Sequence, residues 1–315
     1  MCQKLMIETG QSLSVKEPLP EGKYPSGQEA QETIAHVSPW QEIWQRLRVH
    51  RFFQWGAFVL VLLVLLAIFG PLLTPYSYDG TNLSEGLKPP SSEHWFGTDD
   101  LGRDIFTRVA YGARISLWVG LAAVSGSIVV GTLLGLVAGY FGRWIDTLIS
   151  RLFDIMFAFP SILLAIAIVA VLGGGLVKAL IAISIINIPT FGRLVRSRVV
   201  SLVQEEYVQA ARAIGLGHAP IIFRHILPNT IAPVIVQGSL GIATAILEAA
   251  ALGFLGLGAQ RPTPEWGRML ADAREFFQSA PWTVFFPGVM IMITVLAFNM
   301  LGDALRDVLD PKLKT

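Results

Sequence analysis

Charged residues are scarce in this chain. Asp, Glu, Lys and Arg make up only 15% of its 315 residues, whereas 53% are hydrophobic and the mean hydropathy is +0.56. Soluble domains usually carry about a quarter charged residues. The composition therefore predicts an integral membrane protein. A formal net charge of +1 gives no basic face of the kind that nucleic acid requires, so nucleic acid is excluded as a partner.

Cysteine is nearly absent as well. The single cysteine, Cys2, lies in a polar stretch at the start of the chain, so no disulfide can form within it. The first apolar run begins only at Phe52, later than the apolar part of a cleavable secretory signal would. We expect this run to remain in the mature protein as a membrane anchor.

The groups that intramembrane chemistry requires are missing from the apolar runs. All five histidines lie outside these runs: His36, His50, His94, His218 and His225. Neither the HExxH pattern of zinc proteases nor the GxxxxGK[ST] loop of nucleotide-binding proteins occurs. The sequence therefore predicts no catalytic residue, no bound cofactor and no metal site, and any ATP must be hydrolysed by another subunit.

Six apolar runs are long enough to cross a bilayer, which needs about 20 mostly apolar residues per helix. They cover residues 52–73, 114–139, 151–172, 177–197, 229–257 and 283–303. This pattern predicts an all-α integral membrane protein with six transmembrane helices.

Basic residues are distributed unevenly between the two sides of these spans. The segment 75–113 has three basic residues against six acidic ones, whereas six basic residues precede the first span. Five arginines lie at the end of span four and in the segment before span five, at positions 193, 196, 198, 212 and 224. Cytoplasmic loops carry an excess of Lys and Arg. We therefore expect both termini in the cytoplasm.

Two different segments precede the first span. Residues 1–37 are rich in Gln, Glu, Ser, Gly and Pro, which is typical of a disordered tail. The segment 38–51 begins with Ser38 and Pro39, a cap and a first-turn proline, and repeats apolar residues at helical spacing. It predicts an interfacial amphipathic helix, and docking on the rest of the protein is the equally good alternative.

Two polar residues inside the spans are candidates for a functional role. Glu248 is costly in hydrocarbon, so it is expected to face the bundle interior or water, either lining a translocation path or making a structural pair. Asn187 lies two residues before Pro189, a pattern that favours a helix break over a substrate ligand. Neither residue identifies a substrate.

A polar, glycine-punctuated insert separates the fourth and fifth spans. Residues Glu205 to Ile214 favour a helix that ends at the glycines 215 and 217, and Pro220 suits the first turn of a second helix reaching Leu227. Pro228 would then open the fifth span. Ala211 and Gly215 lie four residues apart on one side of the first helix, where small side chains let another surface come close. The pattern predicts a docking element for a cytoplasmic partner.

This insert resembles the EAA loop of ABC-importer permeases. "QAARAIGLGHAPIIFRHILP" places Gln209-Ala210-Ala211, Gly215 and Leu227-Pro228 at the spacing of that loop, with Gln209 in place of Glu and His225 in place of Ile. Three further stretches, "HWFGTDDLGRDIFTRVAYGARISLWVG", "FLGLGAQRPTPEWGRML" and "LGDALRDVLDPK", resemble the second, C-type permease of dipeptide and oligopeptide importers. The resemblance covers roughly residues 40–312.

The resemblance implies a type I ABC-importer permease fold in a bacterial inner membrane. Its permease core would span 114–303, with a coupling loop at 198–228, after a first transmembrane helix and extracytoplasmic loop at 52–113 and before a cytoplasmic tail at 304–315. ATPase contacts would come from Glu205, Glu206, Gln209, Ala210, Ala211, Gly215, His225, Leu227 and Pro228.

The implied partners are a homologous permease in a heterodimer, two ATPases that bind ATP and Mg, an extracytoplasmic solute-binding protein and membrane lipid. The predicted function is ATP-driven import of di- or oligopeptides by alternating access. The alternative is an ion-coupled transporter that works alone, which would need internal repeats and ionisable relays in the membrane. The sequence offers Glu248 and little else for such a relay.

Overall fold

The computed structural model describes residues 39–309, with side chains from residue 43 onward. The predicted tail 1–37 lies outside the described residues, as does the end of the predicted C-terminal tail, residues 310–315. Residues 43–309 belong to one compact unit, and residues 39–42 begin the first helix. Throughout the described range every regular element is helical, which confirms the predicted all-α class.

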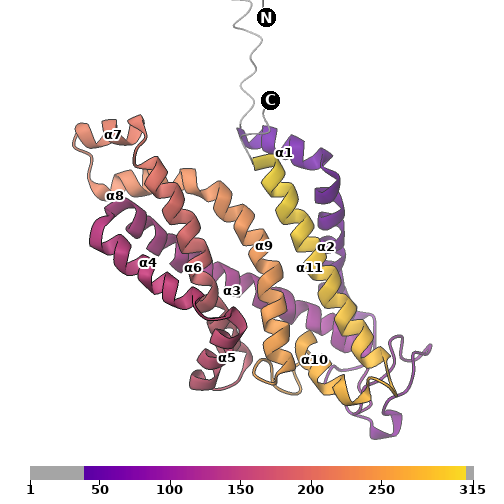
Figure 1. Ribbon diagram of the computed structural model, residues 1–315. Helices are drawn as coiled ribbons and strands as arrows, with labels where there is room; N and C mark the ends of the chain where they lie inside the picture. Colours follow the sequence, from indigo (N-terminus) through magenta and orange to yellow (C-terminus); the bar gives the residue numbers. More distant parts are fainter. Residues whose placement is uncertain (1–38, 310–315) are drawn as a thin grey trace, which may run out of the picture. The chain divides into compact units, whose positions relative to one another are not determined.

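Eleven α-helices follow one another in this range (Figure 1). They are α1 (Pro39–Val49), α2 (Arg51–Phe69), α3 (Ile105–Phe141), α4 (Arg143–Phe157), α5 (Ser161–Leu172), α6 (Leu176–Leu202), α7 (Glu206–Ala213), α8 (His218–Pro220), α9 (Leu227–Phe254), α10 (Trp266–Ala273) and α11 (Trp282–Leu309). A π-helical turn, Ile221–Ile226, joins α8 to α9. The last helix therefore extends into the predicted C-terminal tail.

Five helical segments of the described chain are long and apolar enough to cross a membrane, and a sixth crossing is made only if α4 and α5 count as one span. These two helices meet at a bend of 95°. The span expected over 151–172 is therefore not one continuous helix but is divided between the end of α4 and α5. Pro160 precedes α5 and disfavours helical backbone at the residue before it, so the helix stops although the composition stays apolar.

The third helix begins earlier than its apolar run. Asp104 caps α3, because its carboxylate accepts a hydrogen bond from the Thr107 backbone N–H at 2.7 Å. The helix then runs for 37 residues, nine of them before the predicted start at 114. A buried N-cap with polar residues in the first turns explains the difference, since hydropathy does not register a capped polar turn.

Helices α3 and α6 pack against each other at very short range. Gly131, Gly135 and Gly139 recur every four residues and so lie on one side of α3. A Cβ at Gly131 would lie 2.7 Å from the Ile188 carbonyl oxygen, and one at Gly139 would lie 2.7 Å from the Val199 Cβ. Small residues at this spacing let two helix backbones approach closely in a membrane. The contact therefore depends on the absence of side chains on α3.

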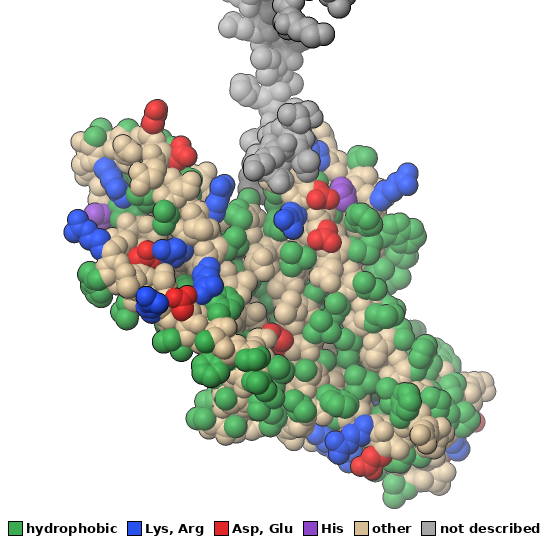
Figure 2. Space-filling model, viewed as in Figure 1, with side chains coloured by type: hydrophobic (Ala, Val, Ile, Leu, Met, Phe, Trp, Pro, Cys, Tyr) green, Lys and Arg blue, Asp and Glu red, His purple; other side chains and the backbone are tan. Residues whose placement is uncertain are grey.

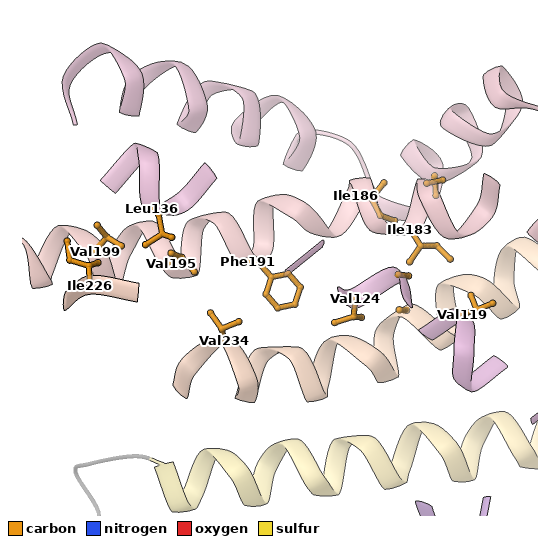
Figure 3. Close-up of a cluster of buried hydrophobic side chains, with 14 of the residues drawn as sticks. Val119, Val124, Leu136, Ile183, Ile186, Phe191, Val195, Val199, Ile226 and Val234 are labelled. Atoms are coloured by element: carbon orange, nitrogen blue, oxygen red, sulfur yellow. The ribbon is translucent and has the colours of Figure 1, made fainter. Parts of the chain in front are cut away.

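The largest core cluster surrounds this contact. Figure 3 shows Leu136 of α3, Phe191 and Val195 of α6 and Val234 of α9 within one group of buried side chains. Towards the other end of the same two helices, Ser127 Oγ donates to the Ser184 carbonyl at 2.8 Å. Ser184 Oγ in turn donates to the Ala123 carbonyl at 2.8 Å. Apolar packing and paired hydroxyl bonds thus hold α3 and α6 along much of their length.

Helix α4 lies against α6 through charge and one aromatic side chain. Arg193 Nη2 is 2.6 Å from Asp154 Oδ1, and Arg196 pairs with Asp146. Phe153 is fully buried, and its ring occupies the space beside Gly192 that a side chain there would fill. The bend between α4 and α5 is therefore held by contacts with α6.

Charged side chains gather towards the two ends of the face seen in Figure 2, and hydrophobic side chains cover much of the stretch between them. Residues 43–49 of α1, helices α7 and α8 and the end of α11 lie at one end in Figure 1, whereas α10 and the segment 73–104 lie at the other. This arrangement fits a chain that crosses a bilayer.

Glu265 joins α10 to the end of α9. Its buried carboxylate accepts hydrogen bonds at 2.8 Å from the backbone N–H groups of Gly267 and Arg268, and it packs beside Gly253. Burial raises the pKa of Glu265 to about 7, although the two N–H groups act in the opposite direction. The Glu265 carboxyl, which caps α10, therefore loses its proton near neutral pH.

The glycine contact predicts the effect of one substitution. Gly135→Leu would place a Cβ 2.9 Å from the Val195 Cβ and 2.5 Å from the Gly192 carbonyl oxygen, so α3 and α6 must separate. Overpacking of this kind costs about 1–3 kcal/mol. We expect a lower thermal unfolding temperature for the purified variant in detergent. Gly288→Leu is the matched control, because nothing lies within 4 Å of its Cβ. Equal unfolding temperatures for the two variants would contradict the contact.

Glu265 predicts a pH dependence of stability. The pKa of Glu265 is about 7 in the folded chain, and its ordinary value is 4.5. The contribution of this carboxyl to the free energy of unfolding is therefore complete below pH 4.5 and is lost as pH rises through 7. The shift corresponds to about 3 kcal/mol. Thermal unfolding between pH 5 and 8 should therefore show a decline that Glu265→Gln removes. If the unmodified protein and the Glu265→Gln variant lose the same stability over this pH range, groups other than Glu265 cause the decline.

Candidate functional site

The predicted docking element forms helix α7 at one end of the described unit (Figure 1). Glu205 caps it in extended conformation, and the helix ends at Gly215, whose φ is +80°. Leu216 N–H donates to the Ala211 carbonyl at 3.1 Å, and Gly215 N–H donates to the Arg212 carbonyl at 3.0 Å. These two bonds form a Schellman motif, in which a residue without Cβ is favoured. The prediction of a short helix ended by Gly215 is confirmed.

The side of α7 that carries Ala211 is buried within the chain, which was not expected. Val208 and Ala211 are buried, at 0% and 6% exposure, and belong to the core cluster of the chain itself. The expectation that Ala211 presents an open side to a partner is therefore wrong. An isolated helix of eight residues is not stable in water, so α7 must bury its small apolar side on its own chain. The exposed candidates are Glu205, Glu206, Gln209, Ala210 and Gly215.

The second part of the insert is continuous with the fifth span. One helical path runs from His218 to Phe254 through the π-helical turn, so the separate helix expected to end at Leu227 is wrong. Leu227 N–H donates to the Ile222 carbonyl, five residues back. Pro228 follows directly, where its ring would clash with a carbonyl in regular α-geometry, and a π-turn relieves this clash. His225 and Leu227 are half-buried and Pro228 is exposed.

Tyr140, at the end of α3, contacts both α7 and α8. Its hydroxyl lies 2.9 Å from His218 Nδ1, and the Arg212 guanidinium lies 5.0 Å from the centre of its ring. Tyr140 itself is 7% exposed. No local pattern predicts this contact, because 78 residues separate Tyr140 from His218. A displacement of α7 and α8 would therefore act directly on α3.

The two polar residues singled out within the spans are brought together. Asn187 Nδ2 donates to Glu248 Oε2 at 2.8 Å and to the Ile183 carbonyl at 3.0 Å. Ser161, the first residue of α5, supplies a further side-chain hydrogen bond to Glu248. Helix α6 continues through Pro189, so the helix break expected at Asn187 does not occur. Three helices thus contribute one polar group each to a cluster inside the membrane-spanning part.

A network of charges lies at the opposite end of the unit. Arg103 Nε is 2.7 Å from Asp99 Oδ2, and both Arg261 and Arg268 lie 2.9 Å from Asp272 Oδ1. Burial and the neighbouring Asp99 raise the pKa of Asp100. Arg261 Nη2 lies 4.0 Å from Asp100 Oδ2 and so connects two of the stretches on which the family resemblance rests, 94–120 and 254–270. Sequence reasoning missed it, because the connected stretches are far apart in the chain.

An open cavity of about 470 Å³ adjoins this network. Its polar lining includes Arg261, Arg268, Arg274, Asp272 and Glu275. Acidic and basic groups are mixed along it, so the lining favours no single sign of charge. The cavity by itself therefore does not indicate a solute.

Comparisons with known families agree with the arrangement of the helices. Residues 131–315 match the family described as binding-protein-dependent transport system inner membrane component. Residues 38–90 match the N-terminal TM domain of oligopeptide transport permease C. The two matches together include α7, the Asn187–Glu248 cluster and the first span. They confirm the predicted resemblance to the C-type permease.

Curated relatives are similar over nearly their whole length. The dipeptide transport system permease protein DppC of Alkalihalophilus pseudofirmus is 62% identical over 291 residues, which cover 92% of this chain and 96% of the relative. The glutathione transport system permease protein GsiD of Pectobacterium atrosepticum is 49% identical over 283 residues, covering 88% of this chain and 93% of the relative. Both relatives are permease components of transport systems.

A solved structure shows the same fold. An inward-facing conformation of the MetNI methionine ABC transporter aligns with a TM-score of 0.50 at 18% identity, covering 64% of this chain and 96% of that chain. The predicted type I importer fold is thereby confirmed, and the ion-coupled alternative is not supported. The chain belongs to the family of binding-protein-dependent transport system inner membrane components and is a permease subunit of an ABC importer.

Proposed function

We propose that this permease carries di- or oligopeptides into the cytoplasm. The observation that carries the proposal is the 62% identity to a dipeptide permease over nearly the full length of both chains. This chain would act in a heterodimer with a homologous permease. Two ATPase subunits would bind ATP and Mg, and an extracytoplasmic binding protein would deliver the solute.

The coupling role of α7 follows from its two sides. Its buried side, Val208 and Ala211, packs on the core of the chain, while Glu206, Gln209 and Ala210 are free to contact an ATPase. A partner can shift a conformational equilibrium only by binding one state better than the other. Closure of the ATPases on ATP would change their contacts with this exposed side. Tyr140 and the continuous path into α9 would pass the displacement to the spans.

The orientation proposed for this chain places α7 and the residues 43–49 in the cytoplasm. The basic residues before the first span and around α7 support it, as does the acidic excess of the segment 75–113. The loop between α9 and α11 would then face outward, together with the charge network around Asp99 and Asp272.

The function is tested with the complete importer in proteoliposomes. We expect uptake of radiolabelled dialanine into the lumen of vesicles that hold right-side-out complexes, and this uptake should require ATP inside the vesicles and the binding protein outside. The control is the permease pair reconstituted without ATPases. Dipeptide accumulation by this chain alone, driven by a proton or sodium gradient, would contradict the proposal.

The same preparation tests the exposed side of α7. Ala210→Phe adds volume at the expected ATPase contact, where overpacking costs about 1–3 kcal/mol, so ATPase retention should fall roughly 5- to 150-fold. Gln278→Phe, exposed at the opposite end, is the control and should retain the ATPases. Ala211→Phe should instead lower the unfolding temperature, because that site is buried. If the Ala210→Phe importer keeps its ATPases and takes up dialanine normally, α7 does not couple the ATPases to transport.

Cysteine labelling tests the orientation. In a chain carrying Cys2→Ser, Ser92→Cys and Ser201→Cys each introduce one exposed thiol, on opposite ends of the unit. An impermeant maleimide added to intact cells should label Ser92→Cys and spare Ser201→Cys. Permeabilised cells, in which both thiols react, provide the control. The reverse pattern would invert the proposed topology.

A further inference from the structure

Glu248 carries a carboxylate that has no cationic partner among the described residues. Its polar contacts are with the amide of Asn187 and the hydroxyl of Ser161. The residue is 9% exposed. An ionisable side chain within a membrane span is costly and normally pairs with another group or faces water. The hydrogen bonds orient this carboxylate but leave any negative charge on it uncompensated.

Glu248 and Asn187 lie within helices that are long and apolar enough to cross a membrane, away from the helix ends. Six residues separate Glu248 from the end of α9 at Phe254, which is about 9 Å of helix at 1.5 Å per residue. Eleven residues separate Asn187 from the start of α6, which is about 16 Å. Glu248 therefore lies more than one and a half helical turns from the end of α9, farther than its own short side chain can extend.

The side of α9 that borders Glu248 is not covered by this chain. Thr244 is exposed one turn before Glu248, Leu247 is 48% exposed beside it, and Phe254 is 44% exposed further along the same side. Ser161 is exposed as well. A carboxylate beside such a surface is compatible with a water-filled path or a second protein, whereas lipid is unfavourable there.

We propose that Glu248 is a binding site for the α-ammonium group of the transported peptide, a proposal that rests on the proposed function above. An ammonium group supplies a positive charge and three hydrogen-bond donors, which suit a carboxylate that lacks a cation. The dipeptide and glutathione in the names of the two relatives share one free α-amino group. This shared group carries a positive charge and donors that a single carboxylate can recognise.

Asn187 acts as a positioning residue in this site. Its amide nitrogen is fixed by the Ile183 carbonyl and donates its second hydrogen to Glu248 Oε2. The amide therefore holds one carboxylate oxygen and leaves lone pairs of the carboxylate for an incoming donor. A purely structural role would need only an oxygen acceptor at position 248, which a glutamine side chain also provides. This difference separates the two roles experimentally.

The first test measures the charge itself in the assembled importer. Thr244→Cys, in a complex without other cysteines, places a thiol one turn from Glu248. We expect a cationic methanethiosulfonate reagent to react with it faster than an anionic reagent of the same size. Glu248→Gln should reduce this preference at least about tenfold, as expected for removal of a nearby charge. No preference for the cationic reagent with Glu248 intact would overturn the proposal, and this measurement requires no change at Glu248.

The second test measures transport. With binding protein at saturation, Glu248→Gln should lower dialanine uptake per ATP hydrolysed at least about tenfold, because a hydrogen bond to a charged group is lost. The binding-protein concentration that gives half-maximal uptake should stay the same. Glu248→Asp, which keeps the charge, should restore part of the uptake. The Thr244→Cys complex with Glu248 intact is the matched control.

The outcomes separate this proposal from the proposed function. If the unmodified importer takes up no dipeptide, the peptide function itself fails. If it takes up dialanine and the Glu248→Gln importer does so equally well, with the thiol preference unchanged, the ammonium site fails and the cluster is a structural hydrogen bond.

Discussion

The close approach of α3 and α6 is the contact on which the rest of this permease depends. In lipid, apolar side chains gain little by leaving their surroundings, so helices associate mainly through packing and hydrogen bonds. Gly131, Gly135 and Gly139 remove the side chains that would keep the two backbones apart. The same closeness brings the serines 127 and 184 within hydrogen-bond distance of the opposite backbone. Gly192 of α6 likewise lets α4 come close, because the Phe153 ring of α4 occupies the space that a side chain at position 192 would fill.

This pair of helices connects the two candidate functional regions. Tyr140 follows directly after the last glycine of the α3 contact and reaches His218 in the docking element. Asn187 stands on α6 beside the glycine contact and reaches Glu248 on α9. The docking element and the polar cluster are thus attached to the same pair of helices. Movement imposed on α7 would shift α3 and α6 together, and with them the surroundings of Glu248.

Local features of this structure could be predicted from the sequence, and long-range ones could not. Apolar runs define most spans, and Gly215 defines the end of α7, because hydropathy and left-handed backbone are properties of neighbouring residues. The bend before α5 had a local signal in Pro160, but the apolar composition on both sides concealed it. The burial of Ala211 and the contact of Tyr140 with His218 depend on segments far apart in the chain. The pairing of Asn187 with Glu248 likewise requires the packing of α6 on α9, which no local pattern specifies.

The central claim is that α3 carries the motion of the docking element without deforming. It is tested most directly by the distance between spin labels at Ala213 on α7 and Ser125 on α3, both exposed, measured by pulsed electron paramagnetic resonance in the assembled importer. The account predicts the same narrow distance distribution in the nucleotide-free and ATP-bound states, while the distance from Ala213 to a label on an ATPase changes. A shifted or broadened distribution for the Ala213–Ser125 pair on ATP binding would contradict it.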